Sequence, residues 1–200
     1  MKRILYTALL VTATTLAACT PDKKTEDTEV VEAAEAAEDD AGTDTASDTT
    51  LTDAKKDFIK QLAQHNLLQV AIGRLASTKS TNNEVKQNGQ QMVQLYSTSQ
   101  TNLQDLAQSY GMPLDTVLQE DYSKHIEDLT KLNAADFDKK YLEKVTDVQK
   151  EALDAFDDVL KGDAGADASA FGVWATTTEK ELRAQHEQAL ARQQQLKNDQ

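Results

Sequence analysis

Apolar residues recur at helical spacing through most of residues 53–200, and this pattern constrains the fold more than any other feature. Residues three or four apart lie on one face of an α-helix, so each such stretch can bury one side against its neighbours. Gly and Pro, which mark the turns of β-rich domains, number only 7 and 2 in 200 residues. The sequence therefore predicts an all-α domain.

Four long helices and one short helix are expected from this pattern. The long helices cover about residues 52–78, 82–110, 134–160 and 167–196, and the short one covers 118–132. Four long amphipathic helices with a short accessory helix predict a four-helix bundle. A chain of this length can bury enough apolar surface to fold without disulfides.

The expected helix ends carry recognisable capping residues. Thr81 and Glu84 have the spacing of a capping box, in which both side chains bind free backbone N–H groups at a helix start. Gly111 can adopt the left-handed conformation that ends a helix. Asn133 and Asp167 are expected to cap the last two long helices.

The N-terminal region has the layout of a secretory signal. A positive start is followed by an apolar stretch too short to span a bilayer, and then by LAAC, which ends at Cys19, the one cysteine of the chain. LAAC resembles the lipobox of bacterial lipoproteins, in which the Cys thiol is acylated and the chain is cut before it. The alternative is an ordinary cleaved signal followed by an unpaired cysteine, which is unusual because cysteines outside the cytoplasm normally pair. Residue 20 is Thr rather than the Asp that tends to retain such proteins at the inner membrane, which favours the outer membrane and a domain facing the periplasm.

Residues 20–52 consist largely of Thr, Asp, Glu and Ala, with little to bury. Low hydrophobicity and high negative charge predict disorder. The expected organisation is therefore a signal peptide over 1–18, a lipidated disordered linker over 19–52 and a helical bundle over 53–200. The linker is either a tether or a spacer without a specific role. The formal net charge of −13 argues against nucleic acid as a partner, so membrane contact is expected through lipid on Cys19.

Sequence motifs for catalysis or metal binding are lacking. A standard di-iron bundle needs Glu-x-x-His on two helices, because residues three apart present both side chains to one inward point. The residues three before the histidines His65, His125 and His186 are Leu62, Tyr122 and Arg183. The chain also lacks Gly-x-Ser-x-Gly and a phosphate-binding Gly loop. No catalytic residue, metal site or cofactor is expected, although His65 and His186 fall on or near inward faces.

Several segments resemble one bacterial family of envelope proteins, domain of unknown function 4142. The most specific are GRLA at Gly73, NNEVK at Asn82, QQMV at Gln90 and AADFDKKYL at Ala134. The resemblance implies a ferritin-like four-helix bundle, often behind a signal peptide, without an established activity.

The resemblance also implies where metal ligands have been replaced. Members often carry Glu or His where this chain has Gln69 or Ala71, Tyr96, Gln149 and Gln185, with His186 one residue from the last position. This favours an anchored envelope protein with a binding or structural role and no catalytic activity, whose envelope partner the sequence does not name. One alternative is a ferritin-like metal-binding or redox stress protein of the periplasm. Another is a subunit that pairs with other helices through its inward polar residues.

Overall fold

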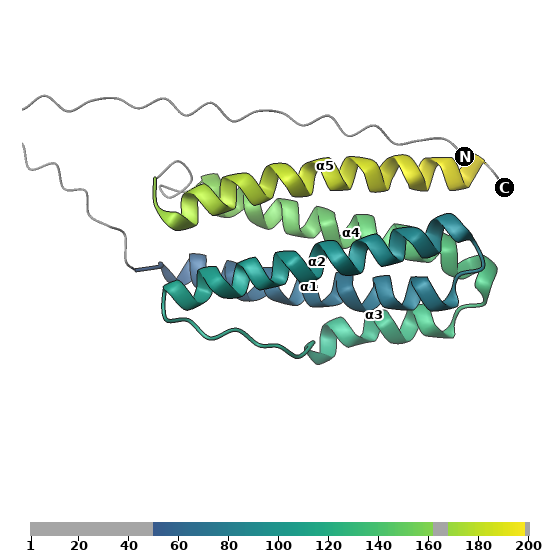
Figure 1. Ribbon diagram of the computed structural model, residues 1–200, viewed down its shortest axis with the longest axis horizontal. Helices are drawn as coiled ribbons and strands as arrows, with labels where there is room; N and C mark the ends of the chain where they lie inside the picture. The colour runs from purple at the N-terminus through teal and green to yellow at the C-terminus, as the bar shows by residue number, and fades with distance from the viewer. Residues whose placement is uncertain (1–49, 162–167, 199–200) are drawn as a thin grey trace, which may run out of the picture. The chain divides into compact units, whose positions relative to one another are not determined.

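The computed structural model describes residues 50–161 and 168–198, and in these residues it contains helices and no strands. The helices are α1 (Asp53–Lys79), α2 (Asn83–Ser109), α3 (Glu120–Lys131), α4 (Ala134–Lys161) and α5 (Ala170–Asn198) (Figure 1). This confirms the predicted all-α fold, with four long helices and a short accessory helix. The predicted signal peptide, Cys19 and nearly all of the acidic linker lie outside the described residues.

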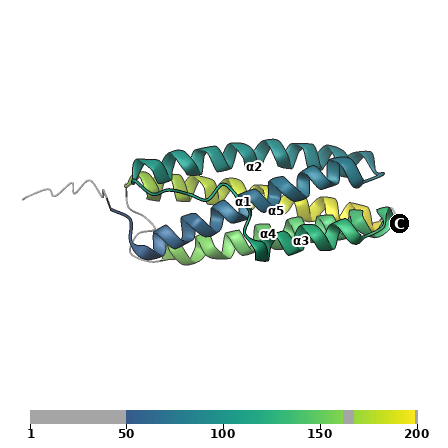
Figure 2. The same ribbon diagram turned by 90° about the horizontal axis from the view of Figure 1, so that it is seen from below.

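Two helical hairpins build the bundle. The chain runs along the bundle in α1 and back in α2, then returns through residues 110–119 and α3 before forming α4 and α5 (Figures 1 and 2). α1 packs against both α2 and α4, and α4 packs against α5. α3 lies over the seam between α1 and α4, whereas α2 and α5 touch only weakly. The bundle is therefore closed on three sides and open along the α2–α5 seam.

The α1–α2 hairpin is held closely together by two glycines. A Cβ atom on Gly89 would lie 2.5 Å from the carbonyl oxygen of Gly73, and one on Gly73 would lie 2.8 Å from the carbonyl oxygen of Gly89. Both glycines lie inside helices, Gly73 in α1 and Gly89 in α2. The absence of both side chains lets the two backbones touch, which draws α2 toward α1.

The helix ends confirm some predicted caps and correct others. Asn133 caps α4, since its Oδ1 accepts a hydrogen bond from the Asp136 N–H at 3.0 Å. α2 is capped by Asn82, whose Oδ1 accepts from the N–H of Glu84 at 2.8 Å, so the predicted Thr81 capping box is wrong. Asn82 immediately precedes the first helical residue, and its short amide reaches the free N–H groups directly.

The start of α5 also differs from the prediction. The helix begins at Ala170, and the Ser169 Oγ accepts a hydrogen bond from the Gly172 N–H at 3.0 Å. Ser169 therefore takes the capping position expected for Asp167, which lies outside the described residues. Serine caps a helix as well as aspartate does, so residue type alone does not choose between two neighbouring candidates.

The end of α2 matches the prediction. Gly111 adopts a left-handed backbone conformation with φ of 66°. Its N–H bonds to the carbonyl of Gln108 at 2.9 Å, and the N–H of Met112 bonds to the carbonyl of Ala107 at 2.9 Å. These two bonds form a Schellman motif, which satisfies carbonyl groups at the helix end.

Candidate functional site

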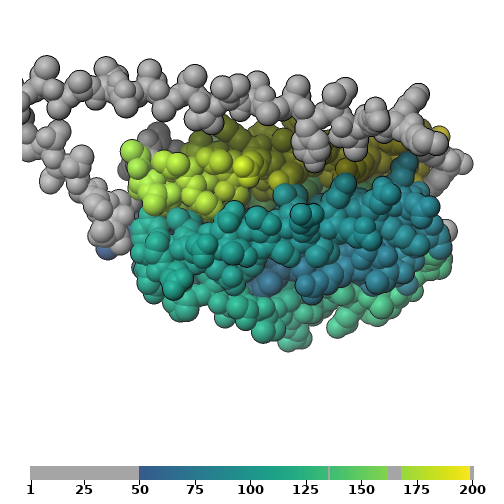
Figure 3. All heavy atoms as spheres, in the orientation of Figure 1, coloured from purple at the N-terminus to yellow at the C-terminus, as the bar shows by residue number. Residues whose placement is uncertain are grey.

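A long groove lies along the open seam between α2 and α5. Its volume is about 970 Å³, and α1 and α4 contribute residues to its floor. Figure 3 shows the face on which the two helices meet, with α5 above α2. The volume lies at the upper end of the range for small-molecule sites, roughly 300–1,000 Å³.

Two hydrogen bonds link α5 to the α2 segment. The Phe171 N–H donates to the hydroxyl of Tyr110, the residue after α2, at 3.2 Å, although neither residue lines the groove. An Arg192 guanidinium nitrogen donates to the Gln91 Oε1 at 3.2 Å. The α2 residues that line the groove run from Asn88 to Asn102, a rise of about 21 Å at 1.5 Å per residue. The groove therefore follows the middle of α2 rather than the whole length of the bundle.

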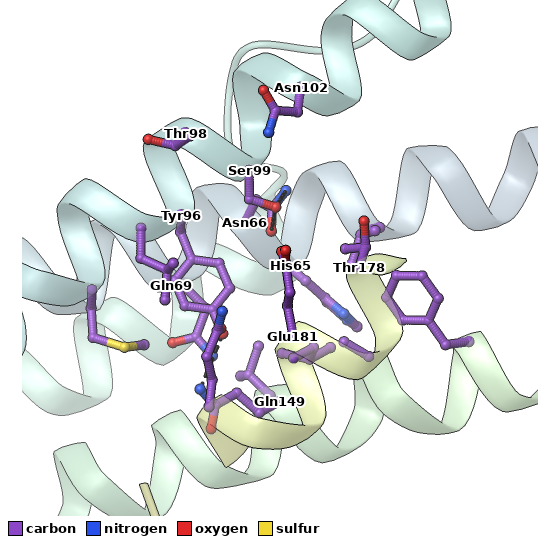
Figure 4. Close-up of a pocket in the computed structure, with 18 of the residues that line it drawn as sticks. His65, Asn66, Gln69, Tyr96, Thr98, Ser99, Asn102, Gln149, Thr178 and Glu181 are labelled. Carbon is purple, nitrogen blue, oxygen red and sulfur yellow. Dashed lines mark hydrogen bonds between the residues drawn. The ribbon is translucent and has the colours of Figure 1, made fainter. Parts of the chain in front are cut away.

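A layer of buried polar side chains forms the middle of the floor. Gln69 of α1, Tyr96 of α2 and Gln149 of α4 come from three helices and lie next to one another (Figure 4). Gln149 Nε2 donates to the Tyr96 hydroxyl at 3.1 Å, and Gln69 Nε2 donates to the Val145 carbonyl at 3.2 Å. Burial raises the pKa of Tyr96, so its phenol stays protonated at neutral pH. The layer is uncharged.

Two oxygen acceptors in this layer have no hydrogen-bond partner among the described residues. They are the Oε1 atoms of Gln69 and Gln149, and each side chain is only 1% exposed. A buried acceptor without a partner destabilises the folded state by about 1–3 kcal/mol. The layer beneath the groove therefore contains two fully buried acceptors that lack a partner among the described residues.

His65 of α1 lies beside this layer and is also buried. Burial lowers its pKa to about 4, so the ring is neutral at physiological pH. Its Nε2 lies 3.8 Å from Glu151 Oε2, and its ring packs edge-on against Tyr122 with centroids 5.7 Å apart. Its Nδ1 is buried without a partner among the described residues. Because the Glu151 carboxylate is 62% exposed, solvent screens it, and it does little to stabilise a charged imidazole.

The groove lining exposes more apolar than polar surface, and few of its residues are charged. Of the 28 described residues that line it, nine are Asn or Gln and four are Ser or Thr. Glu181 and Arg192 are the only Asp, Glu, Lys or Arg residues among them, although 28% of the chain's residues are of these types. Trp174, the one tryptophan of the chain, lies on the α5 wall near Phe156, with ring centroids 6.0 Å apart.

Comparison with known proteins places the chain in a family. Residues 40–191 match the family described as domain of unknown function (DUF4142). The chain belongs to this family. Searches of curated proteins and of solved structures found no match.

Membership of the DUF4142 family confirms the resemblance expected from the sequence. The structure also shows where the residues lie at which this resemblance implied that metal ligands had been replaced. Gln69, Tyr96 and Gln149 converge on the groove floor, and Gln185 lines the same groove. His186 does not line it, although burial lowers the pKa of its half-buried ring. His65 and His186 therefore do not share this site. His125 of α3 does not line the groove either, and Asp121, one turn before it, accepts a hydrogen bond from Lys124 at 2.7 Å.

The donor set of this DUF4142 bundle does not fit a di-iron or dimanganese centre. Such centres gather several carboxylates and imidazoles at one point, whereas this site offers two amides, a phenol and the single imidazole of His65. In residues 50–161 and 168–198, no three His, Cys, Asp or Glu side chains group closely enough to hold a metal ion. Over the same residues, no helix has both the length and the apolarity of a membrane span.

The sequence did not reveal the groove itself. Leu95 fits the apolar stripe of α2, yet it lines the groove and is 37% exposed. The pairing of Asn66 Nδ2 with Ser99 Oγ at 3.2 Å across the α1–α2 interface was also not anticipated. The available signal was the pair Gly73 and Gly89, since a glycine inside a helical pattern often marks a close backbone approach.

Proposed function

We propose that this protein is a lipid-anchored protein of the bacterial outer membrane, facing the periplasm, whose bundle binds a ligand in the α2–α5 groove without catalysing a reaction. The anchor rests on the lipobox-like LAAC that ends at Cys19. The binding role rests on the groove.

One observation carries the binding role: a groove of about 970 Å³ lies over a buried polar layer in which two acceptors have no partner among the described residues. A bundle whose interior served only stability would gain about 1–3 kcal/mol for each acceptor replaced by an apolar group of the same shape. Polar groups that lower stability are typical of binding sites, where function opposes the most stable packing. The Oε1 atoms of Gln69 and Gln149 fit this description.

The single tryptophan gives a direct assay for ligand binding. Trp174 lines the groove, so a bound molecule should change its fluorescence. The test adds the low-molecular-weight fraction of a cell-envelope extract to the full-length protein in mild detergent. We expect a saturable change in Trp174 emission.

Two matched variants locate the binding. Thr178→Arg places a long charged side chain on the α5 wall of the groove, and it should abolish the fluorescence change. Ala184→Arg introduces the same side chain at an exposed position of α5 that does not line the groove, and it should leave the change intact. A wild-type protein without a response, or equal responses from both variants, would refute binding in this groove.

A further inference from the structure

We propose that the groove holds the acyl chain of a single-chain phospholipid whose zwitterionic head group lies beside Arg192. This inference rests on the proposed binding function and adds the chemical class of the ligand. Three features support it: the apolar surface of the groove, a polar pocket that continues from one end of the groove, and the two opposite charges of that pocket.

The exposed surface of the groove suits a hydrocarbon chain. More of this surface is apolar than polar, and it includes Leu95 of α2 and Val173 of α5, which are 37% and 60% exposed. The unpartnered oxygens of Gln69 and Gln149 have almost no exposed surface, so an apolar occupant takes no hydrogen-bond partner from them. Glu181, the one acidic residue of the described lining, is exposed, and its carboxylate can stay in water at the rim. Covering the apolar surface is therefore favourable.

The lining changes from apolar to polar along α5. The first α5 residues that line the groove are Ala170, Val173 and Trp174. The last ones include Gln185, Gln188 and Arg192. An amphiphile matches this order if its chain points toward the start of α5 and its head group lies near the end.

A smaller pocket continues the groove past Arg192. Its volume is about 320 Å³, and unlike the groove it exposes more polar than apolar surface. Asn88, Gln91 and Arg192 line both the groove and this pocket, so the two are neighbours. The bond from Arg192 to Gln91 lies at their boundary and uses one of the five N–H donors of the guanidinium. A polar head group that follows an apolar chain would meet the remaining donors there.

The charges of the smaller pocket indicate a zwitterion. Among the described residues that line it, Arg192 of α5 and Glu84 of α2 are the only Asp, Glu, Lys or Arg residues. A guanidinium binds two phosphate oxygens at once, and a carboxylate attracts an ammonium group. A phosphoethanolamine head group carries a phosphate and an ammonium a few bonds apart. It has no net charge, so the net charge of −13 on the chain does not repel it.

The dimensions of the groove suit one acyl chain. A bilayer core of about 30 Å is two chains thick, so one chain reaches about 15 Å. The α2 residues that line the groove, from Asn88 to Asn102, rise about 21 Å. Outside the groove, α2 exposes polar residues such as Gln90 and Thr101, and α5 exposes charged ones such as Lys180 and Glu187. A second chain would cover these polar groups, which is unfavourable.

A second copy of the protein would also cover apolar surface, but it fits less well. The centre of a stable homodimer interface is apolar and poor in charge. Here Leu95 and Val173 are exposed on a face that also carries Glu181 and Arg192. Each copy has a net charge of −13, so two copies repel each other at long range.

The test uses contact quenching of Trp174, the one tryptophan of the chain, by bromine atoms on a lipid probe. Full-length protein is reconstituted in vesicles of diacyl phosphatidylcholine, because free detergent would compete for the groove. The probe is tetradecanoyl lysophosphatidylethanolamine with bromine either near the methyl end of the chain or near its carbonyl. Trp174 and Arg192 are about 27 Å apart along α5, so saturable quenching should be about twofold stronger from the methyl end.

Unbrominated competitors separate the roles of chain and head group. Tetradecanoyl lysophosphatidylglycerol keeps the chain and the phosphate but lacks the ammonium. Monotetradecanoylglycerol keeps only the chain, and glycerophosphoethanolamine keeps only the head group. We expect lysophosphatidylethanolamine to displace the probe about tenfold better than either single-chain competitor, because a hydrogen-bonded charge is lost in each. Glycerophosphoethanolamine should not displace it.

Matched variants locate the two parts of the ligand. Arg192→Gln should weaken probe binding about tenfold and leave displacement by monotetradecanoylglycerol unchanged, whereas Arg183→Gln alters an arginine of α5 that lines neither pocket and should have no effect. Val173→Ser should weaken probe binding about fivefold, whereas Leu190→Ser, at an exposed apolar residue outside the groove, should not. Glu84→Gln should remove the preference for ethanolamine over glycerol head groups.

The outcomes separate the ligand class from the binding function. If the envelope fraction changes Trp174 emission in the same vesicles and the probe does not quench saturably, the phospholipid is wrong and the proposed function stands. Equal quenching from both bromine positions, equal effects within either variant pair, or stronger quenching by brominated diacyl phosphatidylcholine would also overturn the single-chain phospholipid. Self-association that Val173→Ser abolishes, without quenching, would identify a second copy as the occupant instead. If neither the envelope fraction nor the probe acts, both proposals fail.

Discussion

Substituting Gly89 by Ala tests whether backbone contact between α1 and α2 shapes the bundle. In an isolated helix this change would stabilise by about 0.8–1.0 kcal/mol, because Ala is the better helix former. In this structure the new Cβ would lie 2.5 Å from the Gly73 carbonyl oxygen and 2.9 Å from both the Ala76 Cβ and the Ser77 nitrogen. Two of these three atoms belong to the backbone of α1, so the helices themselves must separate.

The stability lost when the two helices separate should exceed the stability gained from the higher helix propensity of Ala. Adding a methyl group to a well-packed interface costs about 1–3 kcal/mol, and separated helices also lose contacts along the interface. We expect a net loss of about 1–2 kcal/mol, which for a domain of this size lowers the melting temperature by roughly 2–8 °C. Thermal and urea unfolding monitored by circular dichroism measure this change.

The neighbouring substitution Gln90→Ala is the control. Gln90 is exposed on α2, so its change should stay within about 0.5 kcal/mol. The double variant Gly73→Ala/Gly89→Ala should lose less than the sum of the single losses, since the first methyl group already separates the helices. If Gly89→Ala instead stabilises the protein by the full gain of about 0.8–1.0 kcal/mol expected from helix propensity, the close contact is refuted.

Four further predictions concern other parts of the chain. Tyr96→Phe should destabilise the folded state by about 1–3 kcal/mol in urea unfolding, because it leaves the Gln149 amide without a partner. Adding Gln149→Leu should recover most of this loss, and additive losses would contradict the pairing. Burial lowers the pKa of folded His65 from 6.5 to about 4, so the unfolded chain binds the proton first, and stability should fall by about 3 kcal/mol between pH 6.5 and 4. His65→Gln should lose less over that range in pH-dependent melting, and an identical pH profile would be incompatible with a buried neutral ring. Cys19→Ser should release the protein from the membrane fraction, whereas an intact mass showing unmodified Cys19 in the wild type would exclude the anchor. Deleting residues 22–50 should change the melting temperature by less than about 3 °C, since this segment has little apolar surface to bury; a larger fall would show that it packs on the bundle.

The sequence predicted the helices well because a helix depends on residues that are close together in the chain. The apolar period places Phe137, Tyr141 and Val145 on one face of α4, and all three are fully buried. Gly111 ends α2 as its lack of a side chain predicts. The choice between Thr81 and Asn82 failed because two good capping residues stand next to each other, and only the chain direction entering the helix decides between them.

The groove could not be predicted in this way, because it depends on distances between helices. Each helix has an apolar stripe, and the stripe of α2 alone gives no reason for Leu95 to be exposed. The opening arises because the contact of Gly73 with Gly89 draws α2 toward α1 while α5 packs on α4. The polar floor was more accessible to prediction, since Gln69 and Gln149 interrupt otherwise apolar inward stripes.

The position of α3 makes the mechanical compliance of the bundle anisotropic. α3 packs against both α1 and α4 along their seam, so this seam resists opening. On the opposite side, two hydrogen bonds link α5 to the α2 segment, from the Phe171 N–H to the Tyr110 hydroxyl and from Arg192 to Gln91. Thermal motion should therefore act mainly on the width of the groove, with the α1–α4 seam as the hinge. Hydrogen exchange of α5 amides should accordingly be faster than that of α1 amides.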